Sequence, residues 1–122
     1  MNVLNLSDVA ARLPEAWNSL PVGRVGTACV KVLRMDGTPL PEERHPTAET
    51  LLVLDGHLEL LVDGAPVPVR AGELLTVPAD TPHAVGPGSR GTLVIVELSE
   101  EGWRTPGPVS GLRRRRRSSA GR

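Results

Sequence analysis

The sequence contains no phenylalanine or tyrosine, and Trp17 and Trp103 are its only large aromatic side chains. A pocket in this protein must therefore be walled mainly by Val, Leu, Ile and Met, and stacking of a sugar or base on an aromatic platform is not expected. The single cysteine, Cys29, excludes an internal disulfide and is expected to be a small buried hydrophobe.

Long apolar runs are also missing. No run exceeds four residues, as in the segment from Leu51 to Leu54, whereas a bilayer span requires roughly 20. The first residues lack the basic start and long apolar stretch of a secretory signal, so we expect a cytoplasmic location and no membrane partner.

Charge of one sign does not dominate the whole chain, because 14 basic residues balance 14 acidic ones. Six of the basic residues lie at or beyond Arg113 and none of the acidic ones does, so residues 1–112 carry a net charge of −6. An acidic body argues against nucleic acid as the ligand. The five arginines at 113–117 are expected to be solvated, with at most a weak contribution to binding nucleic acid, an acidic partner or a membrane surface.

Glycine and proline punctuate the chain at short intervals, with 13 and 12 copies in 122 residues. Short apolar runs separated in this way are typical of an all-β sandwich or barrel. The length fits one domain. We expect it to occupy residues 1–104, and we expect residues 105–122 to form a flexible, disordered basic tail.

Local signals predict the individual elements. Ser7 is expected to cap a short helix that Pro14 ends. The segment 25–35 is rich in Val, Thr and Cys and is predicted to be one strand, and the polar segment 38–50 follows it. Further strands are predicted at 51–54, 57–62, 67–70, 73–77, 83–85 and 92–98, with hairpin turns at Asp55–Gly56 and Asp63–Gly64. So many short strands favour an antiparallel barrel or jelly roll, since closure removes exposed edges.

Glu43 and His45 are two residues apart in a segment expected to be extended, so their side chains lie on the same face. Glu49 follows four residues later, and His83 begins a predicted strand far along the chain. Histidine and carboxylate are side chains that suit a first-row divalent metal. By contrast, His57 follows a predicted hairpin glycine and is interpreted as structural. Lys31 and Arg34 are three residues apart, so at most one of them reaches the barrel interior.

The spacing of these residues resembles the two sequence motifs of the cupin family. Gly37, Glu43, His45, Glu49 and Gly56 follow the spacing of the first motif, with Glu43 where the family usually has histidine. Gly72, Pro78, Asp80 and His83 follow that of the second motif, with Asp80 where glycine is usual. The resemblance implies a small double-stranded β-helix, or jelly roll, that holds one divalent transition metal (Fe, Mn, Zn or Ni).

Carried over to this chain, the resemblance implies Glu43, His45, Glu49 and His83 as metal ligands. Glu43 is either a fourth ligand or a catalytic general base beside a three-ligand ion. The implied functions are a metal-dependent enzyme of oxygenase, isomerase or epimerase type acting on a small molecule, or a non-catalytic cupin that binds a small ligand. A third hypothesis is an interaction protein whose basic tail recruits an acidic partner. A homodimer with contacts through residues 25–35 and the N-terminal segment is expected on family grounds.

Overall fold

The computed structural model describes residues 1–98, which form one helix and eight strands. The elements are α1 (Leu6–Ala11), β1 (Leu20–Val25), β2 (Ala28–Asp36), β3 (Leu40–Glu43), β4 (Glu49–Val62), β5 (Ala65–Arg70), β6 (Leu74–Val77), β7 (His83–Val85) and β8 (Arg90–Leu98). The predicted all-β fold with a short N-terminal helix is confirmed. The expected tail at 105–122 and the boundary at residue 104 lie outside the described residues. No helix within residues 1–98 has the length and apolar character needed to cross a membrane.

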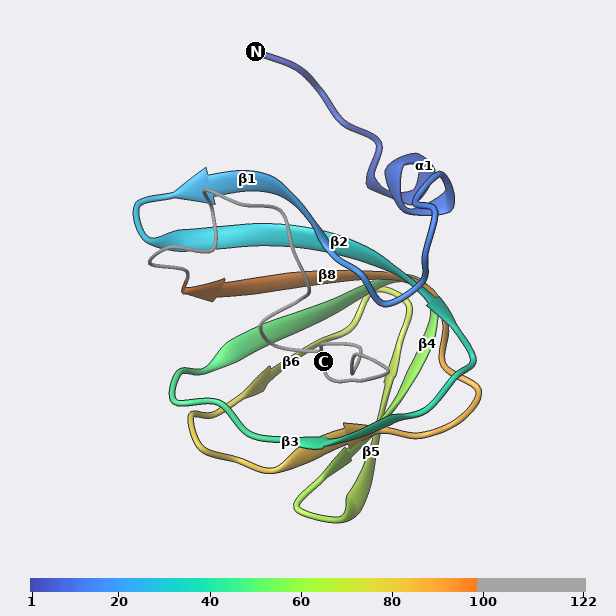
Figure 1. Ribbon diagram of the computed structural model, residues 1–122, viewed down its shortest axis with the longest axis vertical. Coiled ribbons are helices and arrows are strands. Elements are labelled where there is room, and N and C mark those ends of the chain that lie inside the picture. Colours follow the sequence, from blue (N-terminus) through green and yellow to red (C-terminus); the bar gives the residue numbers. More distant parts are fainter. Residues whose placement is uncertain (99–122) are drawn as a thin grey trace.

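The strands pair antiparallel in the order β1-β2-β8-β4-β7-β3, and β5 and β6 also pair with β4. Figure 1 shows the two layers that result, with β1, β2 and β8 above and β3 and β5 below. The long strand β4 belongs to both layers, because its first half pairs with β8 and β6 and its second half pairs with β7 and β5. This is the jelly roll that the sequence predicts.

A bend at Gly56 lets one strand serve both layers. Gly56 has φ +79°, and a Cβ at this position would overlap the carbonyl oxygen of Arg90 on β8. Only glycine adopts this conformation at such close approach without strain. The predicted hairpin at Asp55–Gly56 is therefore wrong: a glycine with positive φ bends a continuous strand here, and 49–62 is one element.

The true hairpins lie elsewhere. Asp63 and Gly64 have φ 51° and 80°, the two positive values that a type I′ turn requires, and they join β4 to β5 as predicted. The segment 25–35 is not one strand, because the chain reverses at Gly26 (φ +60°) and β1 pairs with β2. The polar segment 38–50 contains β3, a short strand that pairs only with β7 among the described elements.

Helix α1 covers part of the outer face of the upper layer. Ala10 packs there against Val32 and Val94. Asn5, and not Ser7, is the N-cap, since the Asn5 side chain accepts a hydrogen bond from the backbone N–H of Asp8. The N-cap lies two residues earlier than predicted, which leaves the Ser7 hydroxyl to donate to Asp55 at 2.7 Å.

The main core lies between the two layers. Alternate residues of β2, β4 and β8 point inward, and these strands supply most of the core. The core consists of Ala16, Trp17, Leu33, Met35, Leu40, Leu51, Val53, Leu58, Leu60, Val69, Val77, Val85, Leu93 and Ile95. The inner face is therefore mainly apolar, and polar side chains on it are exceptions.

Candidate metal centre

Strand register brings together residues that are far apart in the sequence. Glu43 ends β3 directly opposite His83, which begins β7. Glu49 begins β4, and its side chain lies on the inner face together with those of Leu51 and Val53. His45 follows β3 by two residues, and its carbonyl accepts a hydrogen bond from the backbone N–H of Asp80, which ties the loop after β3 to the loop before β7.

His83 and Glu49 form the buried part of this group. The Nε2 atom of His83 lies 2.9 Å from Oε2 of Glu49, and the two side chains are 2% and 3% exposed. The Nδ1 atom of His83 lies 2.9 Å from the carbonyl oxygen of Thr81, which can only accept, so Nδ1 carries a proton and donates it. The ring is thereby held with Nε2 toward Glu49, as metal-binding histidines commonly are.

Burial and the neighbouring groups shift the pKa of His83 in opposite directions. Burial lowers the pKa of His83, but the Glu49 side chain, the Thr81 carbonyl and the charges of Glu49 and Glu43 outweigh burial and raise it above the ordinary value of 6.5. The site therefore stabilises a positive charge at Nε2 of His83. A divalent cation bound at the same atom would meet the same favourable field.

His45 completes the group from the more open side. Its ring lies 5.1 Å from the ring of His83, centroid to centroid, at an angle of 62°. One ligand atom each from His45, Glu49 and His83 lies within 4.8 Å of the other two. Glu43 stands beside them, with Oε1 3.5 Å from Nε2 of His45, and its side chain is 10% exposed.

The polar atoms of this group are poorly satisfied by the described residues. His45 Nε2, His83 Nε2 and both carboxylate oxygens of Glu49 are buried and make no hydrogen bond of acceptable geometry. His83 Nε2 and Glu49 Oε2 lie 2.9 Å apart and form an ion pair only when His83 is protonated. Buried polar atoms without partners are costly. Two imidazole nitrogens and a carboxylate are the donor set that a first-row divalent metal prefers, so the residues fit such an ion.

The structure thus brings His45, Glu49 and His83 together and leaves Glu43 at the edge of the group. His57 lies apart from it, with a side chain 47% exposed and paired with Glu59 at 2.8 Å, as its structural interpretation expects. The sequence reasoning missed Glu97, which lies opposite Glu49 in the register of β8 and β4. Alternation with the core residues Leu93 and Ile95 is the signal that places Glu97 on the inner face.

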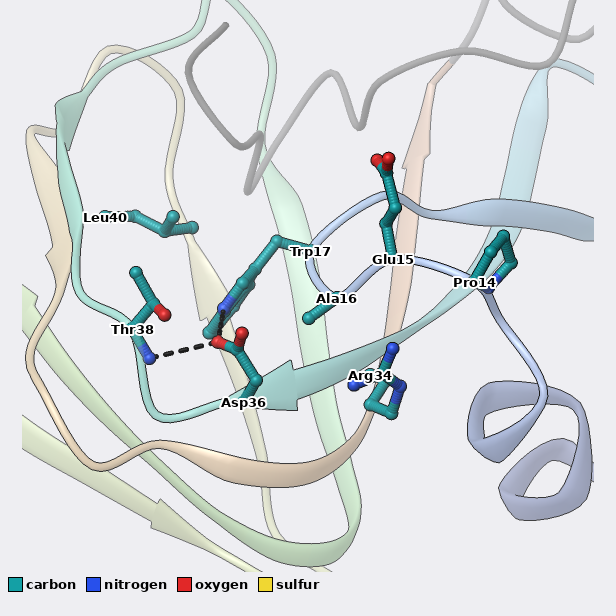
Figure 2. A pocket seen from close by; sticks show the side chains of 8 residues that line it. All are labelled: Pro14, Glu15, Ala16, Trp17, Arg34, Asp36, Thr38 and Leu40. Atoms are coloured by element: carbon teal, nitrogen blue, oxygen red, sulfur yellow. Dashed lines mark hydrogen bonds between the residues drawn. The ribbon is translucent and has the colours of Figure 1, made fainter. Parts of the chain in front are cut away.

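Of Lys31 and Arg34, it is Lys31 that reaches the interior. Arg34 lies on the opposite face of β2 and lines a surface pocket of about 350 Å³, which Figure 2 shows. Its Nη2 donates to the carbonyl of Leu13 at 3.0 Å. In the same pocket, Asp36 accepts from the indole N–H of Trp17 at 2.8 Å (Figure 2). Arg34 therefore faces away from the candidate metal centre.

Comparison with known proteins is consistent with this arrangement. Residues 32–98 match the family model described as "Cupin domain". No curated protein has a sequence that matches the chain.

Several solved structures share the fold. A cupin-2 domain containing protein from Shewanella frigidimarina superposes with a TM-score of 0.72 at 20% identity, covering 79% of this chain and 94% of that one. An RmlC-like cupin from the same organism gives 0.61 at 20% identity, covering 70% and 78%. Hydroquinone 1,2-dioxygenase from Sphingomonas sp. TTNP3, in complex with 4-nitrophenol, gives 0.72 at 25% identity, covering 81% of this chain and 33% of that one.

Proposed function

Because the chain belongs to the cupin family, we propose that it binds one divalent transition metal ion through His45, Glu49 and His83 and acts on a small molecule beside that ion. The observation that carries the proposal is that the facing atoms of these three side chains are buried and lack hydrogen-bond partners among the described residues. Iron, manganese, zinc and nickel all accept nitrogen and oxygen donors of this kind.

Each residue of the group has a distinct part in the proposal. Glu49 supplies a buried negative charge, and the Thr81 carbonyl holds the His83 ring in the tautomer that presents Nε2. Glu43 is the proposed general base, because its carboxylate adjoins the group and is not fully buried. Binding Glu43 as a fourth ligand is the alternative role. When bound, the ion would supply Lewis acidity or a site for oxygen or substrate.

Two functions remain as proposals at this site. A metal-dependent oxygenase, isomerase or epimerase uses Glu43 to move a proton, whereas a non-catalytic cupin only holds its ligand. Glutamate in place of the usual histidine at position 43 lowers the net positive charge of the site and would make a bound ion a weaker Lewis acid. This substitution therefore favours the non-catalytic function. Oxygen uptake that depends on an added substrate would identify the oxygenase, and tight binding without turnover would identify the binding module.

Metal content tests the proposal directly. Wild-type protein purified without an affinity tag and loaded with Zn²⁺ should hold about one equivalent per chain. His45→Ala and His83→Ala should each lose most of it. His57→Ala is the matched control, because His57 is exposed and distant from the group, and it should retain the wild-type content. Equal metal content in all four proteins, or less than about a tenth of an equivalent in the wild type, would contradict the proposal.

The remaining expectations stand as proposals. We propose a homodimer, and since β2 is already paired on both sides, any contact between strand edges in the region 25–35 must involve β1. A cytoplasmic location and a dispensable tail at 105–122 are also proposed. Light scattering of the full chain and of a chain ending at residue 104 would test the dimer and the domain boundary together.

A further inference from the structure

Arg34 also lines a second surface pocket, which lies between helix α1 and the facing ends of β2 and β8. Its volume is about 390 Å³, which falls in the range of roughly 300–1,000 Å³ that is usual for small-molecule sites. Arg34 and Asp36 line this pocket as well as the one drawn in Figure 2. Because both residues lie on the outer face of β2, the second pocket is separate from the candidate metal centre in the interior.

Strand register places a second arginine close to Arg34. Arg34 lies opposite Thr92, and Arg90 lies opposite Asp36, so the two arginines are diagonal neighbours on one face of the β2–β8 pair. Cβ atoms of diagonal neighbours are about 7–8 Å apart or less. Arg90 also lines the second pocket. One small ligand in this pocket can therefore contact both guanidinium groups.

The two carboxylates of the pocket already accept hydrogen bonds from neutral groups. Asp36 accepts from the indole N–H of Trp17 at 2.8 Å. Asp55 accepts from the hydroxyl of Ser7 at 2.7 Å through one oxygen and from the backbone N–H of Thr92 at 3.1 Å through the other. These contacts tie both carboxylates to the surrounding chain instead of to an arginine.

The two arginines are correspondingly short of acceptors. Within residues 1–98, neither of them forms an ion pair. Arg34 donates from Nη2 to the carbonyl of Leu13 at 3.0 Å, but its Nε is buried without a partner. The Arg90 guanidinium packs over Gly37, where a Cβ would come within 2.8 Å of Nη2. Packing therefore orients both guanidinium groups while most of their donors have no acceptor in this part of the chain.

The pocket has no excess of positive charge, because Asp36 and Asp55 lie beside the two arginines. Burial raises the pKa of Asp36, but its hydrogen bonds and the charge of Arg34 outweigh burial and lower it below the ordinary value of 3.8. Asp36 therefore stays ionised at neutral pH. An anion gains here from directed hydrogen bonds to guanidinium groups, which are stronger than hydrogen bonds between neutral groups.

We propose that this pocket binds a small molecule through an anionic oxygen group, a carboxylate or a phosphate, held between Arg34 and Arg90. The planar fork of a guanidinium group matches the oxygen atoms of both anions. Ala10, Ala11 and Met35 line the rest of the pocket and suit a small apolar remainder of the ligand. None of the lining residues belongs to the candidate metal centre, so the two sites are independent.

The test uses acetate and inorganic phosphate as probes. Each is titrated, at constant pH and ionic strength, into ¹⁵N-labelled full-length protein from which metal has been removed with EDTA. The backbone amide signals of Gly91 and Thr92 report on this pocket, which distinguishes it from the five arginines at 113–117. We expect these signals to shift saturably with at least one probe, and the probe that binds more tightly identifies the anionic group.

Two variants with the same change of charge make the test specific. Arg90→Gln removes a charged donor from an exposed position, so the fold should be kept and the affinity should fall at least about tenfold. Arg44→Gln is the matched control, because Arg44 is exposed and does not line the pocket, and its affinity should equal that of the wild type.

Three results would overturn the proposal. The first is that neither probe shifts the Gly91 and Thr92 signals saturably. The second is that Arg90→Gln binds the probe as tightly as the wild type. The third is that Arg44→Gln weakens binding as much as Arg90→Gln, because general electrostatic attraction and not this pocket would then account for the shifts.

Discussion

Replacing Gly56 by alanine tests the bend that allows β4 to join both layers. The added methyl group would meet the carbonyl of Arg90, and its backbone would have to keep φ +79°. A left-handed backbone costs a non-glycine residue about 1–2 kcal/mol. Forcing an extra group into a packed site costs about 1–3 kcal/mol more. The variant should therefore lose about 2–5 kcal/mol, a large share of the 5–15 kcal/mol that holds an ordinary domain folded.

Gly64 provides the matched control. It has almost the same backbone angle, φ +80°, but a Cβ there would meet no atom within 4 Å. Gly64→Ala should consequently show only the backbone cost of about 1–2 kcal/mol. The free energy of unfolding is measured by urea denaturation followed by circular dichroism. If the two variants lose the same stability, close approach of β4 and β8 is not what requires glycine at position 56.

Three further predictions follow from single contacts. The pKa of His83 is raised in the folded protein, so protonated His83 should stabilise the metal-free protein below about pH 6.5. This stabilisation should be lost as the pH rises through the pKa of His83 in the folded protein. Thermal unfolding of His83→Gln should lack this pH dependence. Trp17→Phe removes the N–H donor to Asp36 and should lower the free energy of unfolding, measured by urea denaturation, by about 1 kcal/mol. An unchanged free energy of unfolding would contradict this prediction. Lys31→Met leaves Glu97 buried without its lysine and should cost about 3–5 kcal/mol, most of it recovered in the double variant with Glu97→Met.

The sequence predicted the architecture because its turns and strands carry local signals. Asp63–Gly64 forms the predicted hairpin. Pro68 in the predicted strand at 67–70 suits the edge position of β5, which pairs only with β4 among the described strands. The dipeptide Asp55–Gly56 carries the same local signal but bends a continuous strand. Its outcome depends on β8 packing across it, and a local pattern does not contain that information.

Most of the candidate site was also predictable. Side-chain chemistry and motif spacing selected His45, Glu49 and His83, which the fold then brought together. The place of Glu43 at the edge of the group depends on the register of β3 against β7 and on the path of the loop that follows, so residue spacing could not define it. The sequence motifs do not select Glu97 because neither motif contains it. Only the pairing of β8 with β4 places it beside Glu49.

The most direct test is a crystal structure of the metal-loaded protein, with anomalous diffraction recorded at the absorption edge of the metal. The account predicts one strong anomalous peak at about 2.0–2.2 Å from Nε2 of His45, Nε2 of His83 and a carboxylate oxygen of Glu49. Absence of any peak between these three side chains, or a peak only at an exposed residue such as His57, would contradict it.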